Sequence, residues 1–438
     1  MMDLKQLSKE AGVHLLKVLG VKGSQREFEE LVEEVRGHVL TLNLLGTFLR
    51  DAYGGDIRRR DLVKIEEADA EEQGGHAFHV MNAYVEWLEH GGKNEEGNKK
   101  GRRALAILRL VGLFDRPATA DCLGALWNGE AIPNLTEPLA GLNEAQRNVA
   151  LTRLEAAKLL TVNRDAAGTL VSLDAHPLLR EYFTRQLCAE HPDGWRAAHR
   201  RLYEHLCANA PDKPHPTLED LQPLYQAVAH GCQAGLQREA FDEVYHDRIL
   251  RGTGTDGFYN TKKLGAFGSD LGAVACFFEP PWRRLSPSLK KDRQVWLLNE
   301  AAVALRALGR LTEALEPMRA VTEMTAHLGD FKNAAVDASN LSELELTLGE
   351  VAGAVGHAEQ SVTYADRSGD SFQRITKRCT HADALHQAGR GGDALPRGRA
   401  NAAGMAARLP AALRAARLPV LRPAPRRPRA RRVANHSW

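Results

Sequence analysis

Histidines lie near acidic residues at two places in the sequence, and such groups could bind a metal or transfer protons. His76 and His79 follow Glu71 and Glu72, and two further histidines occur at 199–205 with a glutamate between them. Metal ligation needs three or four side chains that converge on one point. Both groups lie instead on stretches with the spacing of amphipathic helices, whose polar side chains are solvated. We therefore expect no metal site and place these histidines at the surface.

The motifs of nucleophilic, metal-assisted and phosphoryl-transfer catalysis are missing from the sequence. There is no GxSxG, no HExxH and no cysteine–histidine arrangement typical of a nucleophile. There is also no phosphate loop of the form GxxxxGKS or GxxxxGKT, and no strand ending in acidic residues for magnesium. Phosphoryl transfer needs the amides and lysine of such a loop together with a metal carboxylate. We therefore expect a non-catalytic chain with no catalytic residue.

The composition is that of a soluble globular protein in a reducing compartment. The chain has 438 residues, 43% of them hydrophobic and 26% charged, which is long enough for two to four domains. No apolar run approaches the roughly 20 residues that a membrane span needs, and the first residues lack the apolar core of a signal peptide. The six cysteines are scattered without a CxxC pair, which favours free thiols. We expect a cytoplasmic protein.

Charge is distributed very unevenly along the chain. The segment 396–438 holds 11 arginines, 12 alanines and 6 prolines, with no acidic residue and no lysine. Subtracting its +11 from the net +2 of the chain leaves −9 for residues 1–395. A basic arm of this kind can bind nucleic acid non-specifically by neutralising phosphates. The interpretation that we favour is a frameshifted or disordered tail, because it interrupts a helical repeat and its prolines forbid a long helix.

Residues 1–90 have the pattern of a small helical domain. Apolar residues at helical spacing from 7 to 19 predict a first helix, and Ser24 followed by acidic residues caps a second one. A break at Arg36–His38 precedes the strongly apolar segment VLTLNLLGTFL, and two more helices follow within 61–90. The polar segment Gly91–Gly101, rich in glycine and lysine, is predicted to be a linker between domains.

Residues 102–190 have a different pattern, with three helices followed by a β-hairpin. Two short β-branched runs flank Asp165–Gly168, whose composition is typical of a hairpin turn. Three helices and a hairpin follow the order of a winged-helix domain. Such a domain can bind DNA with its third helix, which here carries Arg147, Arg153 and Lys158 among acidic residues. A DNA-binding winged-helix transcriptional regulator is therefore the alternative function.

The C-terminal half contains an internal repeat. Residues 191–290 are predicted to be a helical connector, in which 251–290 has no clear helical or strand pattern. From 294 to 395 the chain repeats every 40 residues: glycines at 309, 349 and 389 mark one turn, and glycines at 329 and 369 the other. Each unit is a helical hairpin that must stack on its neighbours to bury its apolar face. The units look like tetratricopeptide repeats and predict an α-solenoid that presents a surface to a protein or peptide.

The order of segments in 1–395 resembles the C-terminal part of bacterial NB-ARC-type signalling ATPases of the STAND class. The phrase LSKEAGVHLLKVLGV is similar to the first helix of the small helical domain of that module. RGHVLTLNLLGTFL is similar to the helix that packs near the nucleotide base, with Val39 where the family usually has proline. HPLLREYF, after the hairpin, is similar to the winged-helix histidine motif. The resemblance implies a mainly α fold: a small helical domain, a winged helix and a tetratricopeptide-like solenoid.

The resemblance also implies a role for His176, the histidine of HPLLREYF. In the family this histidine contacts the diphosphate of bound ADP, so His176 is the one cofactor-binding residue that we predict. The alternative is that His176 only caps the helix that starts at Pro177. Because the sequence has no phosphate loop, we expect a fragment without the nucleotide-binding domain, which binds no ADP or ATP of its own and oligomerises only with that domain. The expected function is that of a regulatory and sensor fragment whose repeats bind a protein or peptide.

Overall fold

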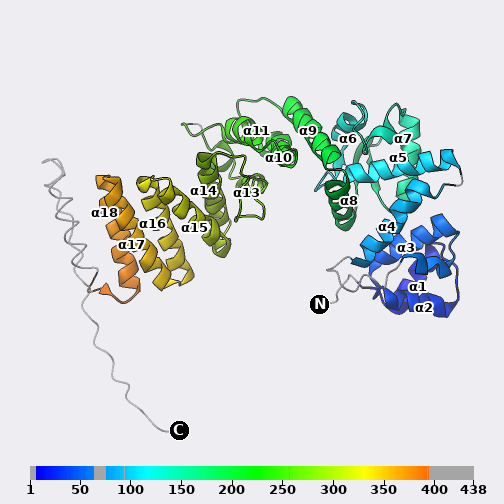
Figure 1. Ribbon diagram of the computed structural model, residues 1–438, viewed down its shortest axis with the longest axis horizontal. Helices are drawn as coiled ribbons and strands as arrows, with labels where there is room; N and C mark the ends of the chain where they lie inside the picture. Colours follow the sequence, from blue (N-terminus) through cyan, green and yellow to red (C-terminus); the bar gives the residue numbers. More distant parts are fainter. Residues whose placement is uncertain (1–5, 64–74, 93, 256, 392, 394–438) are drawn as a thin grey trace, which may run out of the picture. The chain divides into compact units, whose positions relative to one another are not determined.

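The computed structural model is mainly α-helical, as predicted (Figure 1). It divides into two compact units between Lys291 and Asp292. It describes residues 6–63, 75–92, 94–255, 257–391 and 393. The predictions for the segment 396–438 therefore lie outside the described residues. Within the described part of the chain, no helix is long and apolar enough to cross a membrane. All six cysteines are free thiols.

The first helices form a small bundle whose helix ends are set by local capping residues. Ser24 caps α2 in a capping box, and His38 caps α3 by accepting a hydrogen bond from the Thr41 amide. The predicted break between these two helices is therefore present. The apolar faces meet in a core in which Leu16 and Leu45 are fully buried. The elements are α1 (Lys9–Val18), α2 (Gln25–Glu34), α3 (Val39–Tyr53), the 3-10 helix η1 (Ile57–Val63) and α4 (Gly75–His90).

A small antiparallel sheet with the strand order β1-β3-β2 follows, together with several helices. The predicted hairpin is confirmed: Asp165 accepts hydrogen bonds from the amides of Ala167 (2.9 Å) and Thr169 (2.8 Å). Gly168 closes the turn at a φ of +81°, which favours glycine. The strands are β1 (Ala118–Thr119), β2 (Thr161–Arg164) and β3 (Leu170–Asp174). The helices are α5 (Glu95–Val111), α6 (Ala120–Trp127), η3 (Glu137–Leu139), α7 (Glu144–Ala156) and α8 (Pro177–Glu190).

The segment predicted to be a linker, Gly91–Gly101, is mostly the beginning of α5. Asn94 caps this helix by accepting a hydrogen bond from the Gly97 amide at 2.8 Å, and two glutamates follow in the first turn. Gly101 lies where α5 crosses α4, and a Cβ there would collide with the Leu88 carbonyl. The linker prediction is wrong because the glycines were interpreted as helix breakers, whereas Asn94 begins a helix that runs through them. Gly101 is instead needed for the close packing of α5 on α4.

The rest of this unit is a set of packed helices that includes the segment 251–290. α9 and α10 pack against each other, and α13 packs on α10. The buried Asp270 of α13 accepts hydrogen bonds from Tyr245 (3.0 Å) and Asn260 (2.6 Å), which ties three short elements together. Burial raises the pKa of Asp270 to about 6. The elements are α9 (Pro192–Asn209), α10 (Leu218–Gln233), α11 (Gln237–Glu239), the π-helix η4 (Ala240–Leu250), α12 (Tyr259–Lys262) and α13 (Phe267–Ala275).

The second unit is a stack of helical hairpins with a turn every 20 residues. Successive helices from α15 to α18 pack on one another in chain order (Figure 1). Gly309, Gly329, Gly349, Gly369 and Gly389 all have φ between +70° and +82°, a left-handed backbone that favours glycine and ends each helix. The predicted α-solenoid with a 40-residue period is confirmed. Its helices are α14 (Lys291–Ala307), α15 (Leu311–His327), α16 (Phe331–Leu348), α17 (Val351–Ser368) and α18 (Ser371–Gln387).

Candidate functional site

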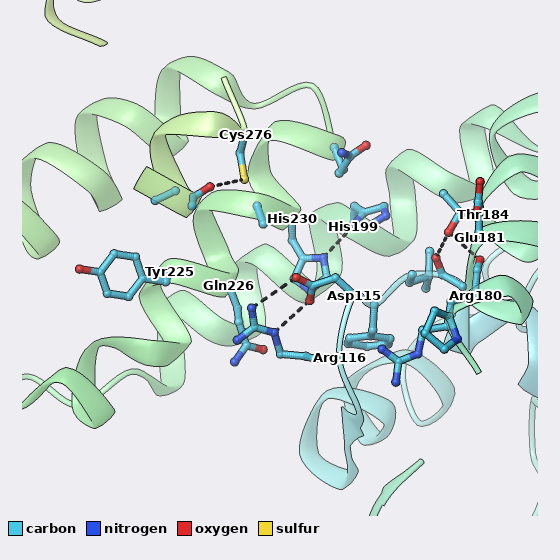
Figure 2. Close-up of a pocket in the computed structure, with 18 of the residues that line it drawn as sticks. Asp115, Arg116, Arg180, Glu181, Thr184, His199, Tyr225, Gln226, His230 and Cys276 are labelled. Carbon is cyan, nitrogen blue, oxygen red and sulfur yellow. Dashed lines mark hydrogen bonds and ion pairs between the residues drawn. The ribbon is translucent and has the colours of Figure 1, made fainter. Parts of the chain in front are cut away.

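A pocket of about 760 Å³ opens in the unit that ends at Lys291. Its walls come from α8, α9, α10 and α13 and from the turn 112–116 that follows α5 (Figure 2). Gly112 lets this turn lie against α8, because a Cβ there would collide with Phe183. The lining mixes aromatic and apolar side chains with charged groups, imidazoles and amides, and a pocket of this volume is typical of a small-molecule site.

Two buried histidines line the pocket and join α9 to α10 (Figure 2). His199 is 2% exposed and His230 is 6% exposed. Their Nδ1 atoms lie 2.8 Å apart, so one ring donates its Nδ1 proton and the other accepts it. The ring of Trp195 packs on His199 at a centroid distance of 4.1 Å, and the ring of Phe114 packs on His230 at 5.5 Å. The pair is a polar contact inside aromatic surroundings.

The surroundings keep both histidines neutral. Burial lowers the pKa of His199 well below its usual range, and the neighbouring His230 lowers it further. Burial also lowers the pKa of His230 to about 4; the Asp115 carboxylate opposes this shift and the Arg116 guanidinium adds to it. At neutral pH the pair therefore presents two uncharged imidazole rings to the pocket.

The charged groups at the pocket are compensated within the chain. Asp115 and Arg116 form an ion pair at 2.9 Å, and Arg116 lowers the pKa of the Asp115 carboxyl. Arg180 of α8 pairs with Asp174 at the end of β3. Each guanidinium therefore has a carboxylate partner, while the Nε atom of Arg180 is buried without a hydrogen-bond partner among the described residues.

His176, the residue predicted to contact a diphosphate, caps α8. Its Nδ1 atom accepts a hydrogen bond from the Leu178 amide at 3.3 Å, and Pro177 occupies the first turn of the helix. Desolvation of the ring by neighbouring atoms lowers the pKa of His176, although the residue as a whole keeps much of its surface in solvent. The residue is exposed and lies outside the lining of the pocket, whereas Pro177 belongs to that lining. The helix-capping interpretation describes its contact within the chain, and its contact with a diphosphate stays a prediction.

The prediction that the histidines of 199–205 are solvated is wrong for His199. This residue shares a helix face with Trp195, Leu202 and Leu206, and the whole face is buried. The spacing of four, three and four residues is that of an apolar helical stripe, so the sequence contained the signal for burial. The partner His230 lies 31 residues further along the chain. Its identity depends on the packing of α9 against α10, which sequence spacing alone does not give.

His205 lies closer to possible metal ligands than the sequence indicates. Its Nε2 atom is 3.2 Å from Asp121, and with the Cys122 thiol the three groups gather within 4.8 Å. The Asn209 amide donates to the His205 carbonyl and also lies 3.2 Å from the ring Nδ1. This amide makes Nδ1 an acceptor and leaves the ring proton on Nε2, facing Asp121. Burial raises the pKa of Cys122 to about 11. The cluster is therefore explained by hydrogen bonding, and the absence of a metal site stays a prediction.

The first pair of histidines lies on α4. His76 and His79 are both half-buried there, rather than fully solvated as predicted. The acidic residues predicted to lie near them, Glu71 and Glu72, are outside the described residues.

The repeat unit holds a buried carboxylate shared between three helices. Glu345 of α16 has a side chain that is 1% exposed. It accepts hydrogen bonds from Arg319 of α15 at 3.1 Å and from His357 of α17 at 2.7 Å. Gly353 of α17 leaves space for this carboxylate, since a Cβ there would lie 3.2 Å from it. A shared acceptor of this kind fixes the register in which neighbouring helices stack.

A groove of about 440 Å³ opens in the repeat unit between α14, α15 and α16. Val303 and Arg306 lie on its α14 side, and Leu344 and Thr347 on its α16 side. The side chain of Val303 is 54% exposed. Arg306 is exposed and forms no ion pair with the residues that the structure describes. The groove therefore combines an accessible apolar side chain with an uncompensated positive charge.

No protein-family model and no curated protein matches the sequence. Among solved structures, the chain is similar to a Signal Transduction ATPase with Numerous Domains (STAND) protein with a tetratricopeptide repeat sensor from Pyrococcus horikoshii. The two are 15% identical with a TM-score of 0.31, and the match covers 91% of this chain and 60% of that one. The chain therefore spans less than two thirds of that structure.

Proposed function

We propose that the chain is a non-catalytic sensor and regulatory protein that binds a protein or peptide through its repeat unit. The observation that carries this proposal is the groove between α14, α15 and α16 in a stack of helical hairpins. Stacked hairpins of this kind form extended surfaces that suit extended or helical segments of other proteins. The exposed Val303 and the unpaired Arg306 fit a segment with an apolar side chain next to a carboxylate.

The unit that ends at Lys291 supplies the regulatory part of this proposal. Its α5–α8 region runs α5, β1, α6, η3, α7, β2, β3 and α8, and its helices precede the β2–β3 hairpin in the order expected for a winged helix. Together with the resemblance of HPLLREYF to the family's histidine motif, this supports assignment to the regulatory arm of a STAND-type switch. In such a switch, a bound partner shifts the equilibrium between closed and open states by its difference in affinity for them.

The test is a selection of peptides on the purified full chain from a random peptide library. We expect enriched peptides that carry an apolar residue close to an acidic one, and a loss of at least tenfold in affinity for Val303→Asp. Val171 on β3 is 49% exposed, so Val171→Asp is the matched control and should leave affinity unchanged. Peptides that bind Val303→Asp as well as the native chain contradict the assignment to this groove. Hydrolysis of ATP by the purified chain contradicts the non-catalytic part.

The alternative function, DNA binding through α7, is less well supported by the described contacts. Arg147 donates hydrogen bonds to Asn128 (3.2 Å) and to the Leu142 carbonyl (3.0 Å). Arg153 stacks over the Trp87 ring at 5.1 Å. These guanidinium groups already have partners within the chain, and a helix that reads DNA needs them free for base edges and phosphates. Sequence-selective DNA binding that survives deletion of 396–438 would restore this alternative, and binding that disappears with the tail would indicate a polycation effect.

A further inference from the structure

The pocket of Figure 2 has one polar wall that is not used within the protein. Gln222, Gln226 and Gln233 lie along one face of α10 and all line the pocket. None of these three amides forms a hydrogen bond with the residues that the structure describes. A side-chain amide both donates and accepts hydrogen bonds. The wall therefore suits a ligand whose edge carries donors and acceptors side by side.

The charges around the pocket favour an uncharged ligand. Its charged lining residues each have a partner of opposite sign: Asp115 pairs with Arg116, Arg180 pairs with Asp174, and Glu181 pairs with Arg185 at 2.6 Å. The two histidines of the lining are neutral at pH 7. A charged ligand would lose its hydration without gaining an unpaired counter-charge in this pocket.

Three buried polar atoms of lining residues have no hydrogen-bond partner among the described residues: Arg180 Nε, His199 Nε2 and the Tyr225 hydroxyl. The Nε2 atom of His199 is buried and has no hydrogen-bond partner among the described residues. The Nδ1 contact with His230 fixes one nitrogen of His199 as donor or acceptor, so Nε2 must take the opposite role. In either tautomer a buried imidazole nitrogen is left unsatisfied, which is unfavourable by about 1–3 kcal/mol and is relieved by a ligand group or a water.

Small residues of α13 line another part of the pocket. Gly268 and Gly272 lie one turn apart on α13, and a Cβ at either position would have no atom within 4 Å. Trp195 and Phe114 also line the pocket, where their rings pack on His199 and His230. A flat ring can therefore lie against apolar and aromatic surfaces while its edge meets amide groups, which is how proteins hold a free base.

We propose that this pocket binds an uncharged heteroaromatic molecule of about nucleoside size, held between aromatic side chains and the glutamine amides of α10. A glutamine amide pairs with the donor–acceptor edge of a base in the same way as in nucleic-acid recognition. The site is separate from the repeat groove and does not depend on the function proposed for that groove. It would give the unit that ends at Lys291 a small-molecule ligand of its own.

Isothermal titration calorimetry of the full chain with adenosine, guanosine, cytidine and uridine tests the proposal. We expect at least one nucleoside to bind with a Kd below about 1 mM, which corresponds to about −4 kcal/mol. Free ribose should not bind, because the ring is the recognised group. The 5′-monophosphate of the best nucleoside should bind no more tightly than the nucleoside. Failure of all four nucleosides at millimolar concentration overturns the proposal, and so does a monophosphate that binds more than threefold more tightly.

A pocket-filling variant locates the site. Gly272→Leu adds a side chain at a lining residue of the pocket where a Cβ meets no atom within 4 Å, and leucine is a better helix former than glycine. It should keep the thermal stability of the native chain and weaken nucleoside binding at least tenfold. Gly356→Leu adds the same side chain to an exposed helical position of α17 and should leave binding unchanged. If Gly272→Leu unfolds the chain, Gln226→Ala is used in its place, and it should weaken nucleoside binding about threefold. Binding that survives the folded pocket variant overturns the proposal.

Discussion

The Nδ1 atoms of His199 and His230 lie 2.8 Å apart, and neither residue is more than 6% exposed. A single proton bridges the two nitrogens. If both rings were protonated, two N–H groups and two positive charges would face each other without solvent between them. The contact between α9 and α10 therefore holds only while at least one ring is neutral, and this makes the stability of the unit depend on pH.

We expect the unit that ends at Lys291 to lose stability as the pH falls below about 6.5, the pKa of an unfolded histidine. The folded-state pKa of His230 is depressed to about 4, so between these values the unfolded chain binds more protons than the folded one. The stabilisation is therefore complete above about pH 6.5 and is lost towards pH 4, by on the order of 3 kcal/mol for His230 alone. Urea unfolding followed by circular dichroism at pH 7.5, 6.5 and 5.5 measures this slope.

Two variants assign the slope to the buried pair. His230→Phe keeps a ring against Phe114 and removes the titrating group, so the dependence on pH between 6.5 and 5.5 should become shallower. His14 is exposed on α1, and His14→Gln should leave the slope of the native chain unchanged. An unchanged slope in His230→Phe would show that other groups control the acid sensitivity.

The shared carboxylate of the repeat unit gives a second prediction. Glu345→Ala removes the common acceptor of Arg319 and His357 and leaves a space beside Gly353. We expect a loss of about 3 kcal/mol, because a buried charged acceptor is removed while its donors stay behind. Glu343 lies two residues earlier on the exposed face of the same helix, and Glu343→Ala should change stability by no more than about 0.5 kcal/mol. Equal urea midpoints for the two variants would contradict the role of Glu345 as a shared acceptor.

Local signals allowed much of the fold to be predicted from the sequence. The hairpin at Asp165–Gly168 and the cap at Ser24 depend on contacts within a few residues, and both are present. The evenly spaced glycines of the repeat also act locally, because each one ends the helix that precedes it. The segment 251–290 lacked such signals, because Asp270 is held by Tyr245, which comes 25 residues earlier in the chain. Its fold depends on non-local contacts.

Less of the candidate site than of the fold could be predicted from the sequence. The pocket is assembled from four helices and a turn that are far apart in the chain, and its glutamines look like ordinary exposed residues of an amphipathic helix. The apolar stripe around His199 indicates that this residue is buried, but nothing in the sequence indicates that His230 is its partner. His176 was predicted from a resemblance, and the structure shows the local helix cap that its position before Pro177 also predicts.

The evenly spaced glycines of the repeat unit give a prediction with opposite signs at two positions. Gly349 ends α16 at a φ of +82°, where an L-residue is unfavourable, so Gly349→Ala should lower stability by about 1–2 kcal/mol. Gly356 lies inside α17 on an exposed face with open space where a Cβ would lie, so Gly356→Ala should raise stability by about 0.5–1 kcal/mol through helix propensity. Thermal unfolding of the two variants should therefore shift the transition of the repeat unit in opposite directions. Shifts of the same sign would mean that Gly349 is not held in the left-handed conformation on which the 20-residue spacing of the turns depends.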